Sequence, residues 1–393
     1  MKVLVFPHHL EIGGSQTNAI DLAVAMRERH GHEVIFFATP GRGSALLAER
    51  GFELLEAPTA SRSPSPRVAA ALSAVVSRRN FDLVHAWDWP QCLDALFGAH
   101  LPHRTPVLGS IMSMSVSRFL PRSMPLTYGT PDLVHQARRR GAKSVSLLEP
   151  PVDLERDSPA EVDGAAFRSQ HRVGADQLAL VVVSRLVSWL KLDGLRRTVA
   201  AAGDLAGLPV RLLVVGEGSA YAELAEQGDA VNRRAGREVV TLVGGMLDPR
   251  PAYAAADVVL GMGGSVLRGM AFGKPAVVLG EGGFSRVFDR ASAPGFLHFG
   301  LYGTGSGDVS GDRLTDQLRS LLLDARRRQE LSDFSRDQVT ARYALADAAD
   351  AVSELYAEVV AAEHALPRLL VEVSRTLAWR SASRVKQGLG IGR

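Results

Sequence analysis

Short apolar runs alternate with longer segments of helical periodicity along the chain, and the alternation occurs in two successive series. The first series opens with an apolar run at 3–6, a helical pattern at 15–29 and a second run at 33–37. The second series contains the apolar runs 178–183 and 210–215, again separated by a helical pattern. Alternating strands and helices build parallel sheets that helices cover on both faces. The sequence therefore predicts an α/β protein with two Rossmann-like parallel-sheet domains.

The break between the two series lies at Pro150 and Pro151, which stop any helix, and in the polar, acidic stretch up to about Gly164. Open α/β sheets bind ligands at the carboxyl ends of their strands, so we expect site residues on loops that follow strands. We predict an N-terminal domain over 1–150, a linker over 151–165, a second domain over 166–345, and C-terminal helices with a basic tail over 346–393.

The composition narrows the class of protein. With 46% hydrophobic and 22% charged residues, the 393-residue chain is typical of folded globular proteins, which excludes disordered and disulfide-scaffold classes. The excess of 45 Lys and Arg over 42 Asp and Glu is too small to predict a nucleic-acid partner. The single cysteine, Cys92, fits a reducing compartment. Because neither a signal-peptide pattern nor a membrane-spanning apolar run occurs, we expect a cytoplasmic protein.

Gly13 and Gly14 follow the first predicted strand and open the first predicted helix. Glycines at such a turn let backbone N–H groups approach an anion beside the positive end of the helix. A tight turn that needs a left-handed residue explains the pair equally well. The third glycine of the dinucleotide fingerprint is missing, which disfavours a nicotinamide enzyme.

Arg185 and Lys191 lie on one loop after the first strand of the second domain. Two cations at a strand end suit a diphosphate, because Arg grips it as a fork and Lys acts as a point charge. A solvated surface pair is the alternative. The chain has only five lysines, which makes a functional role for Lys191 more attractive.

Further glycines follow later strands of the second domain. Gly216 ends one strand, Val243 and Gly244 end the next, and a Gly-rich loop at 261–265 runs into a short helix that ends before Pro275. The start of that helix would again direct backbone N–H groups at an anion.

The order and spacing of these motifs resemble the retaining glycosyltransferase family four, which has the GT-B fold. The similarity covers about residues 1–360. The resemblance implies two Rossmann-like domains facing across a cleft, with a C-terminal helix that crosses back to the first domain. It also implies transfer of a sugar from a nucleotide diphosphate-sugar to a hydroxyl acceptor, which would be a small molecule, a glycan or a lipid-linked acceptor.

The same resemblance assigns roles to individual residues. Arg185 and Lys191 would be the catalytic pair, which stabilises the leaving diphosphate. The implied donor-binding residues are Gly13, Gly14, Gly216, Val243, Gly244, Gly263, Gly264, Ser265 and Arg268. Family members of this kind use a front-face mechanism in which the departing phosphate helps deprotonate the acceptor, so no protein nucleophile is required. The chain has no Asp-x-Asp triplet, and we expect neither a metal nor another cofactor.

The chain departs from the family pattern at positions that contact the donor. Leu260 and Arg268 stand where the family commonly has two glutamates, and Met112 stands where a cleft histidine is frequent. Arg268 is then either a phosphate ligand or a surface residue. Alternative polar contacts to the donor sugar are Ser113, Ser115 and His85.

Trp87 and Asp88 follow the predicted strand that ends at His85. An aromatic face beside a carboxylate suits a polyhydroxylated acceptor, although Trp87 could equally be a packing anchor. Three polar residues on the first turn of the first helix are further acceptor candidates. They are Gln16, Thr17 and Asn18.

The last stretch, 367–393, has six basic residues and one acidic residue, with apolar residues between them. This pattern is typical of a basic amphipathic helix on an anionic membrane, and the returning helix of the GT-B fold with a frayed tail is the alternative. Peripheral contact at the inner face of the membrane therefore stays open. The high Arg content is typical of GC-rich bacteria, in which such enzymes make carbohydrates or natural products. A non-catalytic scaffold subunit and a nucleotide-sugar epimerase are the competing functions.

Overall fold

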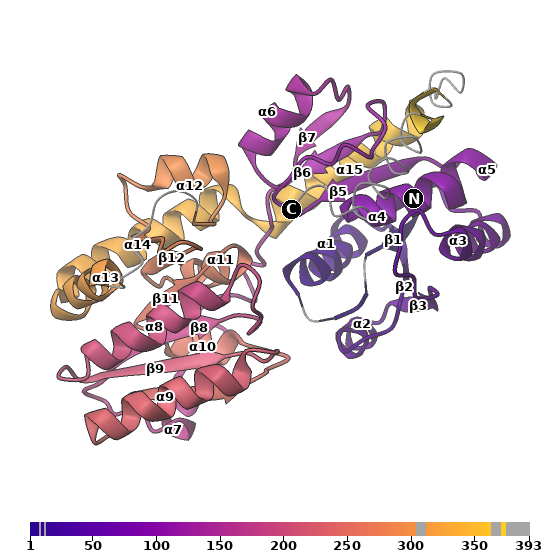
Figure 1. The fold of residues 1–393 in the computed structure, drawn as a ribbon. Coiled ribbons are helices and arrows are strands. Elements are labelled where there is room, and N and C mark those ends of the chain that lie inside the picture. Colours follow the sequence, from indigo (N-terminus) through magenta and orange to yellow (C-terminus); the bar gives the residue numbers. More distant parts are fainter. Residues whose placement is uncertain (8, 12, 304–311, 363–370, 375–393) are drawn as a thin grey trace, which may run out of the picture. The chain divides into compact units, whose positions relative to one another are not determined.

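The computed structural model describes residues 1–393 except 8, 12, 304–311, 363–370 and 375–393. The chain divides into two compact units. Unit 1 contains Met1–Pro151 and Leu345–Arg393, and unit 2 contains Val152–Ala344 (Figure 1). None of the helices in the described ranges is long and apolar enough to cross a membrane.

Unit 1 contains a seven-stranded parallel sheet in the order β3-β2-β1-β4-β5-β6-β7. Its strands are β1 (Lys2–Phe6), β2 (Glu33–Ala38), β3 (Glu53–Glu56), β4 (Leu83–Trp87), β5 (Val107–Ile111), β6 (Leu126–Tyr128) and β7 (Val145–Leu147). Its helices are α1 (Gly14–His30), α2 (Ser44–Glu49), α3 (Pro66–Arg79), α4 (Asp88–Ala95), the π-helix η1 (Leu96–His100), α5 (Leu101–His103), α6 (Pro131–Arg139) and α15 (Leu345–Ala361).

Successive residues of β1 serve different cores on the two faces of this sheet. Leu4 and Phe6 pack into the core beneath α3 and α4, whereas Val3 and Val5 pack into the core beneath α1 and α15. Side chains alternate between faces along a strand, so a strand covered on both sides must be apolar throughout. This is why the N-terminal run of the sequence has no polar residue between Val3 and Phe6.

The returning helix α15 belongs to unit 1, as the GT-B resemblance implies. It packs against α1 and β5, and Val352, Tyr356 and Val359 are buried in the shared core. A buried hydrogen bond of 2.7 Å joins Tyr356 Oη to His85 Nδ1 in β4. The predicted return of the chain to the first domain is therefore confirmed, and it begins at Leu345.

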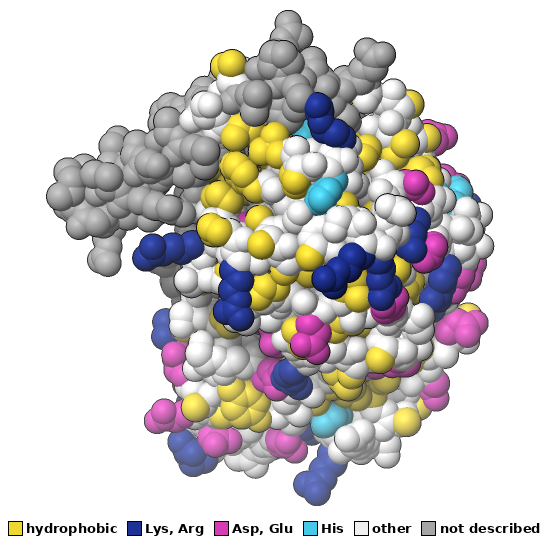
Figure 2. All heavy atoms as spheres, turned by 90° about the vertical axis from the view of Figure 1, so that its right-hand side faces the viewer, with side chains coloured by type: hydrophobic (Ala, Val, Ile, Leu, Met, Phe, Trp, Pro, Cys, Tyr) yellow, Lys and Arg dark blue, Asp and Glu magenta, His cyan; other side chains and the backbone are white. Residues whose placement is uncertain are grey.

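The outer surface of unit 1 over α3 and α5 is rich in basic side chains. Arg67, Arg78 and Arg79 of α3 are exposed, and Arg104 directly after α5 is also exposed. Figure 2 faces this side and shows Lys and Arg side chains across its middle, with apolar side chains between them.

Unit 2 contains a six-stranded sheet in the order β10-β9-β8-β11-β12-β13, in which only β13 is antiparallel to its neighbour. Its strands are β8 (Leu178–Val183), β9 (Val210–Val215), β10 (Val240–Gly244), β11 (Val258–Gly261), β12 (Ala276–Leu279) and β13 (Ser285–Val287). Its helices are α7 (Ala165–Gln170), α8 (Leu192–Asp204), α9 (Tyr221–Ala235), α10 (Arg250–Ala255), α11 (Gly264–Ala271), α12 (Ala293–Phe299), α13 (Asp312–Leu323) and α14 (Ala325–Arg342). The predicted α/β class with two Rossmann-like domains is confirmed.

The segment predicted as a linker packs mostly within unit 2. Val152 is buried against Leu267 and Met270 of α11, and its N–H donates to Tyr343 O at 2.7 Å. Asp157 farther along the segment is also buried. The start of this segment therefore packs on unit 2 with two buried polar residues, Asp157 and Ser158, whereas 159–161 are exposed.

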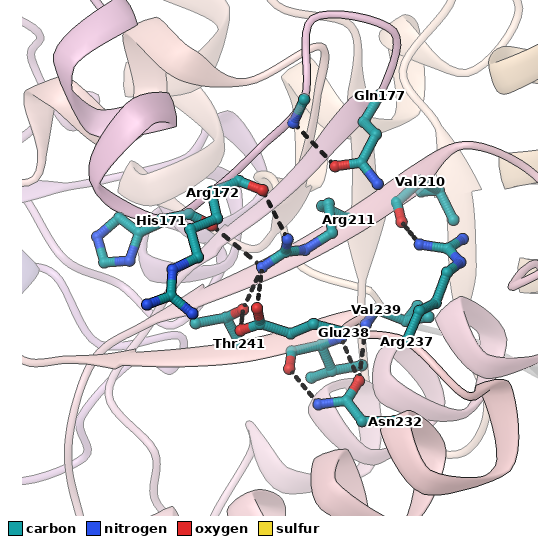
Figure 3. Close-up of polar contacts among 12 residues, drawn as sticks. His171, Arg172, Gln177, Val210, Arg211, Asn232, Arg237, Glu238, Val239 and Thr241 are labelled. Atoms are coloured by element: carbon teal, nitrogen blue, oxygen red, sulfur yellow. Dashed lines mark hydrogen bonds and ion pairs between the residues drawn. The ribbon is translucent and has the colours of Figure 1, made fainter.

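Arg211, at the amino end of β9, connects this strand to the segment after α7 and to the start of β10 (Figure 3). Its guanidinium donates to His171 O at 3.1 Å and Arg172 O at 2.8 Å, and it pairs with Glu238 at 3.2 Å. Burial lowers the pKa of Arg211, and the paired carboxylate opposes that effect. Because these contacts lie at the amino end of the strand, they fix the sheet and leave the carboxyl ends for a ligand.

Candidate functional site

The loop after β8 is held in place by two glycines of the neighbouring loop. A Cβ at Gly216 would lie 1.8 Å from Ser184 O, and a Cβ at Gly218 would lie 2.3 Å from Leu186 O. Both glycines have positive φ, 147° and 146°, where L side chains are strained. Leu186 N–H also donates to Glu217 O at 2.9 Å. A glycine is therefore required at position 216 because two backbone segments approach each other closely there.

The same loop ends in a tight turn before α8. Leu190 is left-handed, with φ 66°, and its N–H donates to Glu281 Oε1 at 3.1 Å. Lys191 N–H donates to Trp189 O at 2.8 Å, which closes a three-residue turn. Lys191 then becomes the first flanking residue of α8, and Arg185 is exposed at the other end of the loop. The turn fixes the backbone of Lys191 at the carboxyl edge of the sheet.

The ammonium group of Lys191 lies in surroundings that disfavour its positive charge, which a bound anion would compensate. Burial, with a further contribution from the charge of Arg185, lowers the pKa of Lys191 from 10.5 to about 8. Within the part of the chain that the structure describes, no carboxylate forms a hydrogen bond or ion pair with Lys191 Nζ. A partly dehydrated cation beside a second cation gains more from a bound anion than a solvated one does. The predicted pair thus lies on one loop and is coupled electrostatically.

The N-terminus of α11 contributes backbone donors at a neighbouring strand end. Gly263, with φ 62°, precedes the helix, and a Cβ there would lie 3.0 Å from Tyr302 Oη. Gly264 has open space around its Cβ position, so its backbone is accessible. The first N–H groups of a helix have no intrahelical acceptor. The Ser265 hydroxyl donates to Met262 O at 3.0 Å, and the contact of its backbone N–H with a phosphate stays a prediction.

Arg268 lies in an ion pair within unit 2. Its Nε is 3.6 Å from Asp157 Oδ2, and the Asp157 side chain is only 5% exposed. Arg250 grips Asp248 nearby, with Nε–Oδ1 at 2.8 Å and Nη2–Oδ2 at 2.6 Å. The Arg268 side chain is therefore partly buried and paired with a carboxylate, and its role as a phosphate ligand stays a prediction.

The end of β10 packs against the loop that follows β9. Gly244 has φ 90°, and its carbonyl accepts a hydrogen bond from Gly216 N at 2.8 Å. A Cβ at Gly245 would lie 2.8 Å from the carboxyl carbon of Glu217. Val243 is half-buried in the adjoining core. These two loops form a continuous backbone surface at the carboxyl edge of β9 and β10.

Asp88 connects three segments at the carboxyl edge of the unit 1 sheet. Its Oδ1 accepts from Met112 N at 3.1 Å and Ser113 N at 3.0 Å, and its Oδ2 accepts from Ser15 Oγ at 3.5 Å. Its backbone is left-handed, with φ 64°. The carboxylate thus links the ends of β4 and β5 to the start of α1. Asp88 sits where an acceptor residue was predicted, but its oxygens serve the protein itself.

The backbone at the start of α1 contradicts one of the two explanations for Gly13 and Gly14, which is the left-handed turn. Gly13 is extended, with φ −163°, so the tight turn does not need a left-handed residue there. A Cβ at Gly14 would meet nothing within 4 Å, which leaves the backbone at the helix start accessible. Thr17 Oγ1 donates to Gly13 O at 3.0 Å, and Asn18 is buried. Of the polar residues predicted on this turn, Gln16 and Thr17 are half-buried, and the acceptor role of Gln16 stays a prediction.

Trp87 and His85 lie inside unit 1. Trp87 is 1% exposed and packs against His85 with ring centroids 5.0 Å apart, so its indole is a core anchor and cannot stack on an acceptor. His85 Nε2 hydrogen-bonds with Ser110 Oγ at 2.7 Å, in addition to the Tyr356 contact. Burial lowers the pKa of His85 to about 3, which keeps the ring neutral. Both side chains are therefore enclosed by the protein and are not accessible to a ligand.

Sequence profiles match both units. A profile of Glycosyltransferase Family 4 matches residues 12–152, and a profile of Glycosyl transferases group 1 matches residues 177–299. The chain belongs to the family 4 type of glycosyltransferases. The second match contains the β8 loop with Arg185 and Lys191 and the start of α11.

Solved structures share the fold of this glycosyltransferase over most of its length. A glycosyltransferase from Rickettsia africae has a TM-score of 0.69 at 14% identity, covering 92% of this chain and 99% of that chain. Anabaena HepE in complex with UDP-glucose has a TM-score of 0.68 at 16% identity, covering 91% and 100%. Sucrose-phosphate synthase from Thermosynechococcus elongatus has 0.67 at 18% identity, covering 92% and 100%. These likenesses confirm the GT-B fold, and no curated protein sequence matches the glycosyltransferase.

The glycosyltransferase contains two residues that sequence reasoning missed. Glu281, in the loop after β12, accepts a hydrogen bond from Leu190 N–H, and Trp189 in the same turn is 75% exposed. An aromatic residue between Arg185 and Lys191 is visible in the sequence, but its exposure is not. Glu281 gives no signal, because its partner is a backbone N–H about ninety positions earlier.

Proposed function

We propose that the protein is a retaining, metal-independent glycosyltransferase that moves a sugar from a nucleotide diphosphate-sugar to a hydroxyl acceptor. The observation that carries the proposal is the Lys191 ammonium, which burial and Arg185 disfavour and which no carboxylate among the described residues compensates. The location of Lys191 at a strand end of the group 1 domain supports a diphosphate as the anion that it binds. Neighbours crystallised with UDP and UDP-glucose share the fold.

The chemistry follows from charge that develops on the leaving group. As the bond between the sugar C1 and the phosphate oxygen breaks, negative charge grows on the diphosphate. Arg185 and Lys191 would stabilise this charge, and the N–H groups at the start of α11 would contribute from a neighbouring strand end. The bond from C1 to the acceptor oxygen forms on the same face, and the acceptor proton passes to a phosphate oxygen. No group of three or more potential metal ligands occurs among the described residues.

A nucleotide panel tests the donor half of the proposal. We expect at least one of UDP, GDP, ADP and dTDP to raise the unfolding temperature of the purified chain, because a ligand that binds the native state stabilises it. Absence of any shift would favour the non-catalytic scaffold. Consumption of the nucleotide sugar without an acceptor, with formation of an isomeric nucleotide sugar, would favour the epimerase.

Two substitutions test the catalytic half. Arg185→Ala and Lys191→Ala should each lower turnover about a hundredfold or more, since each removes a cation from the leaving group. Arg196→Ala is the matched control, because Arg196 lies on the adjacent helix α8 and pairs with Glu223 on the surface. Near-normal turnover of either of the first two variants, or an equal loss in the control, would contradict the assignment.

We also propose peripheral contact with an anionic membrane through the basic C-terminal tail, most of which lies outside the described residues. The described part, 371–374, is attached to unit 1, because Glu372 accepts from Ser123 N at 3.0 Å and Ser123 Oγ at 2.6 Å. Cations near an anionic surface contribute about 1 kcal/mol each. Flotation with phosphatidylglycerol vesicles should retain the wild type and lose a variant with Arg380, Arg384 and Lys386 changed to Gln. Equal flotation of both, or binding to phosphatidylcholine alone, would refute the contact.

A further inference from the structure

Trp189 is the most exposed of the large apolar side chains in the described ranges, at 75%. It lies on the β8 loop between Arg185 and Lys191 in the sequence. A group bound by these two cations would therefore contact the loop that carries the indole. Exposing an indole to water is unfavourable, and exposed aromatic groups beside a binding loop commonly serve a ligand.

The turn that carries Trp189 has a defined backbone. Leu190 next to it is left-handed, and Glu281 Oε1 accepts from its N–H at 3.1 Å. The carbonyl of Trp189 accepts from Lys191 N–H at 2.8 Å. The backbone on the C-terminal side of the indole is therefore fixed, which reduces the entropy that a stacking contact would cost.

The order of strands places this turn relative to the parts of a nucleotide sugar. The family resemblance implies that Gly216, Val243 and Gly244, at the ends of β9 and β10, border the nucleoside, and the proposed phosphate donors follow β8 and β11. Continuing in the same direction, the next strand is β12. Glu281, which holds the Trp189 turn, follows β12 directly. The turn is therefore attached to the side of the phosphate donors that faces away from the nucleoside.

From this placement we propose that the face of the Trp189 indole packs against the ring of the donor sugar, and that it makes the enzyme prefer the nucleotide sugar over the free nucleoside diphosphate. The C–H face of a pyranose is apolar and matches an aromatic face, whereas the free diphosphate has no such group. This inference rests on the proposed function, because it requires a diphosphate at Arg185 and Lys191.

Titration calorimetry on the full-length chain tests the inference. The probes are UDP and UDP-glucose, replaced by the diphosphate and sugar of another base if the thermal-shift panel selects one. Trp189→Ala should weaken binding of the nucleotide sugar about tenfold and leave the affinity for the diphosphate unchanged. Trp189→Phe should show a smaller loss, because it retains an aromatic face. Donor KM should rise in parallel while turnover at saturation stays within about a factor of two.

Leu247→Ala is the matched control, since Leu247 is an exposed apolar residue (63%) on the loop after β10. It should leave the ratio of the two affinities unchanged. If Trp189→Ala changes both affinities equally, or neither, the inference is overturned while the proposed function stands. If the wild type binds no nucleoside diphosphate at all, the proposed function fails and the inference fails with it.

Discussion

The partly buried side chain of Lys191 makes the affinity for a diphosphate depend on pH. The pKa of about 8, against an ordinary 10.5, means that the protonated form is destabilised by about 3 kcal/mol in the unliganded protein. A bound anion favours the protonated form, so the pKa of Lys191 rises on binding. Affinity is then fully present below about pH 8 and falls up to about tenfold per pH unit above it, until the pKa of the complex is reached.

Calorimetry in two buffers of different ionisation enthalpy measures the proton directly. At pH 8, about half of the unliganded molecules have a neutral Lys191, so binding should take up to about half a proton per site. Lys191→Arg keeps the charge and does not titrate in this range, so it should bind without proton uptake. Lys191→Ala should bind weakly and show no dependence on pH above 8. Proton uptake that persists in Lys191→Arg, or no uptake by the wild type, would refute the reasoning.

Four further substitutions test the structure by urea unfolding. Lys191→Met should raise the stability of the unliganded protein at pH 7 by up to about 3 kcal/mol, since the folded state disfavours the charge it removes; unchanged stability would contradict the burial. Gly216→Ala should destabilise by about 2 kcal/mol or more, because its Cβ would overlap a backbone oxygen at 1.8 Å, whereas Gly264→Ala, with open space, should be tolerated. Tyr356→Phe removes the hydrogen bond to His85 and should cost about 1–3 kcal/mol; no loss would show that the contact is not maintained.

The architecture was predictable because it depends on periodicity. Strands buried on both faces must be apolar throughout, and the runs at 3–6 and 178–183 therefore mark the centres of the two sheets. The return of α15 to unit 1 came only from the family resemblance. Composition does not show which polar groups of the segment 152–164 have buried partners, as Asp157 has in Arg268.

The candidate site was predictable in part. The sequence placed Arg185 and Lys191 on one strand-end loop, and the structure confirms that location. It left open whether Trp87 at the end of β4 contacts an acceptor or anchors the core, and the structure buries Trp87 in the core. Glycine patterns were similarly ambiguous, because Gly216 is needed for contact with another backbone while Gly264 has free space. These outcomes depend on tertiary contacts that local sequence does not contain.

Mass spectrometry of the products formed from pooled nucleotide sugars and a cell extract tests the central claim most directly. The wild-type protein should release one nucleoside diphosphate for each acceptor molecule that gains the mass of a sugar, and Arg185→Ala should form at least about a hundredfold less of both. Nucleotide binding without any glycosylated product, or undiminished product with Arg185→Ala, would contradict it.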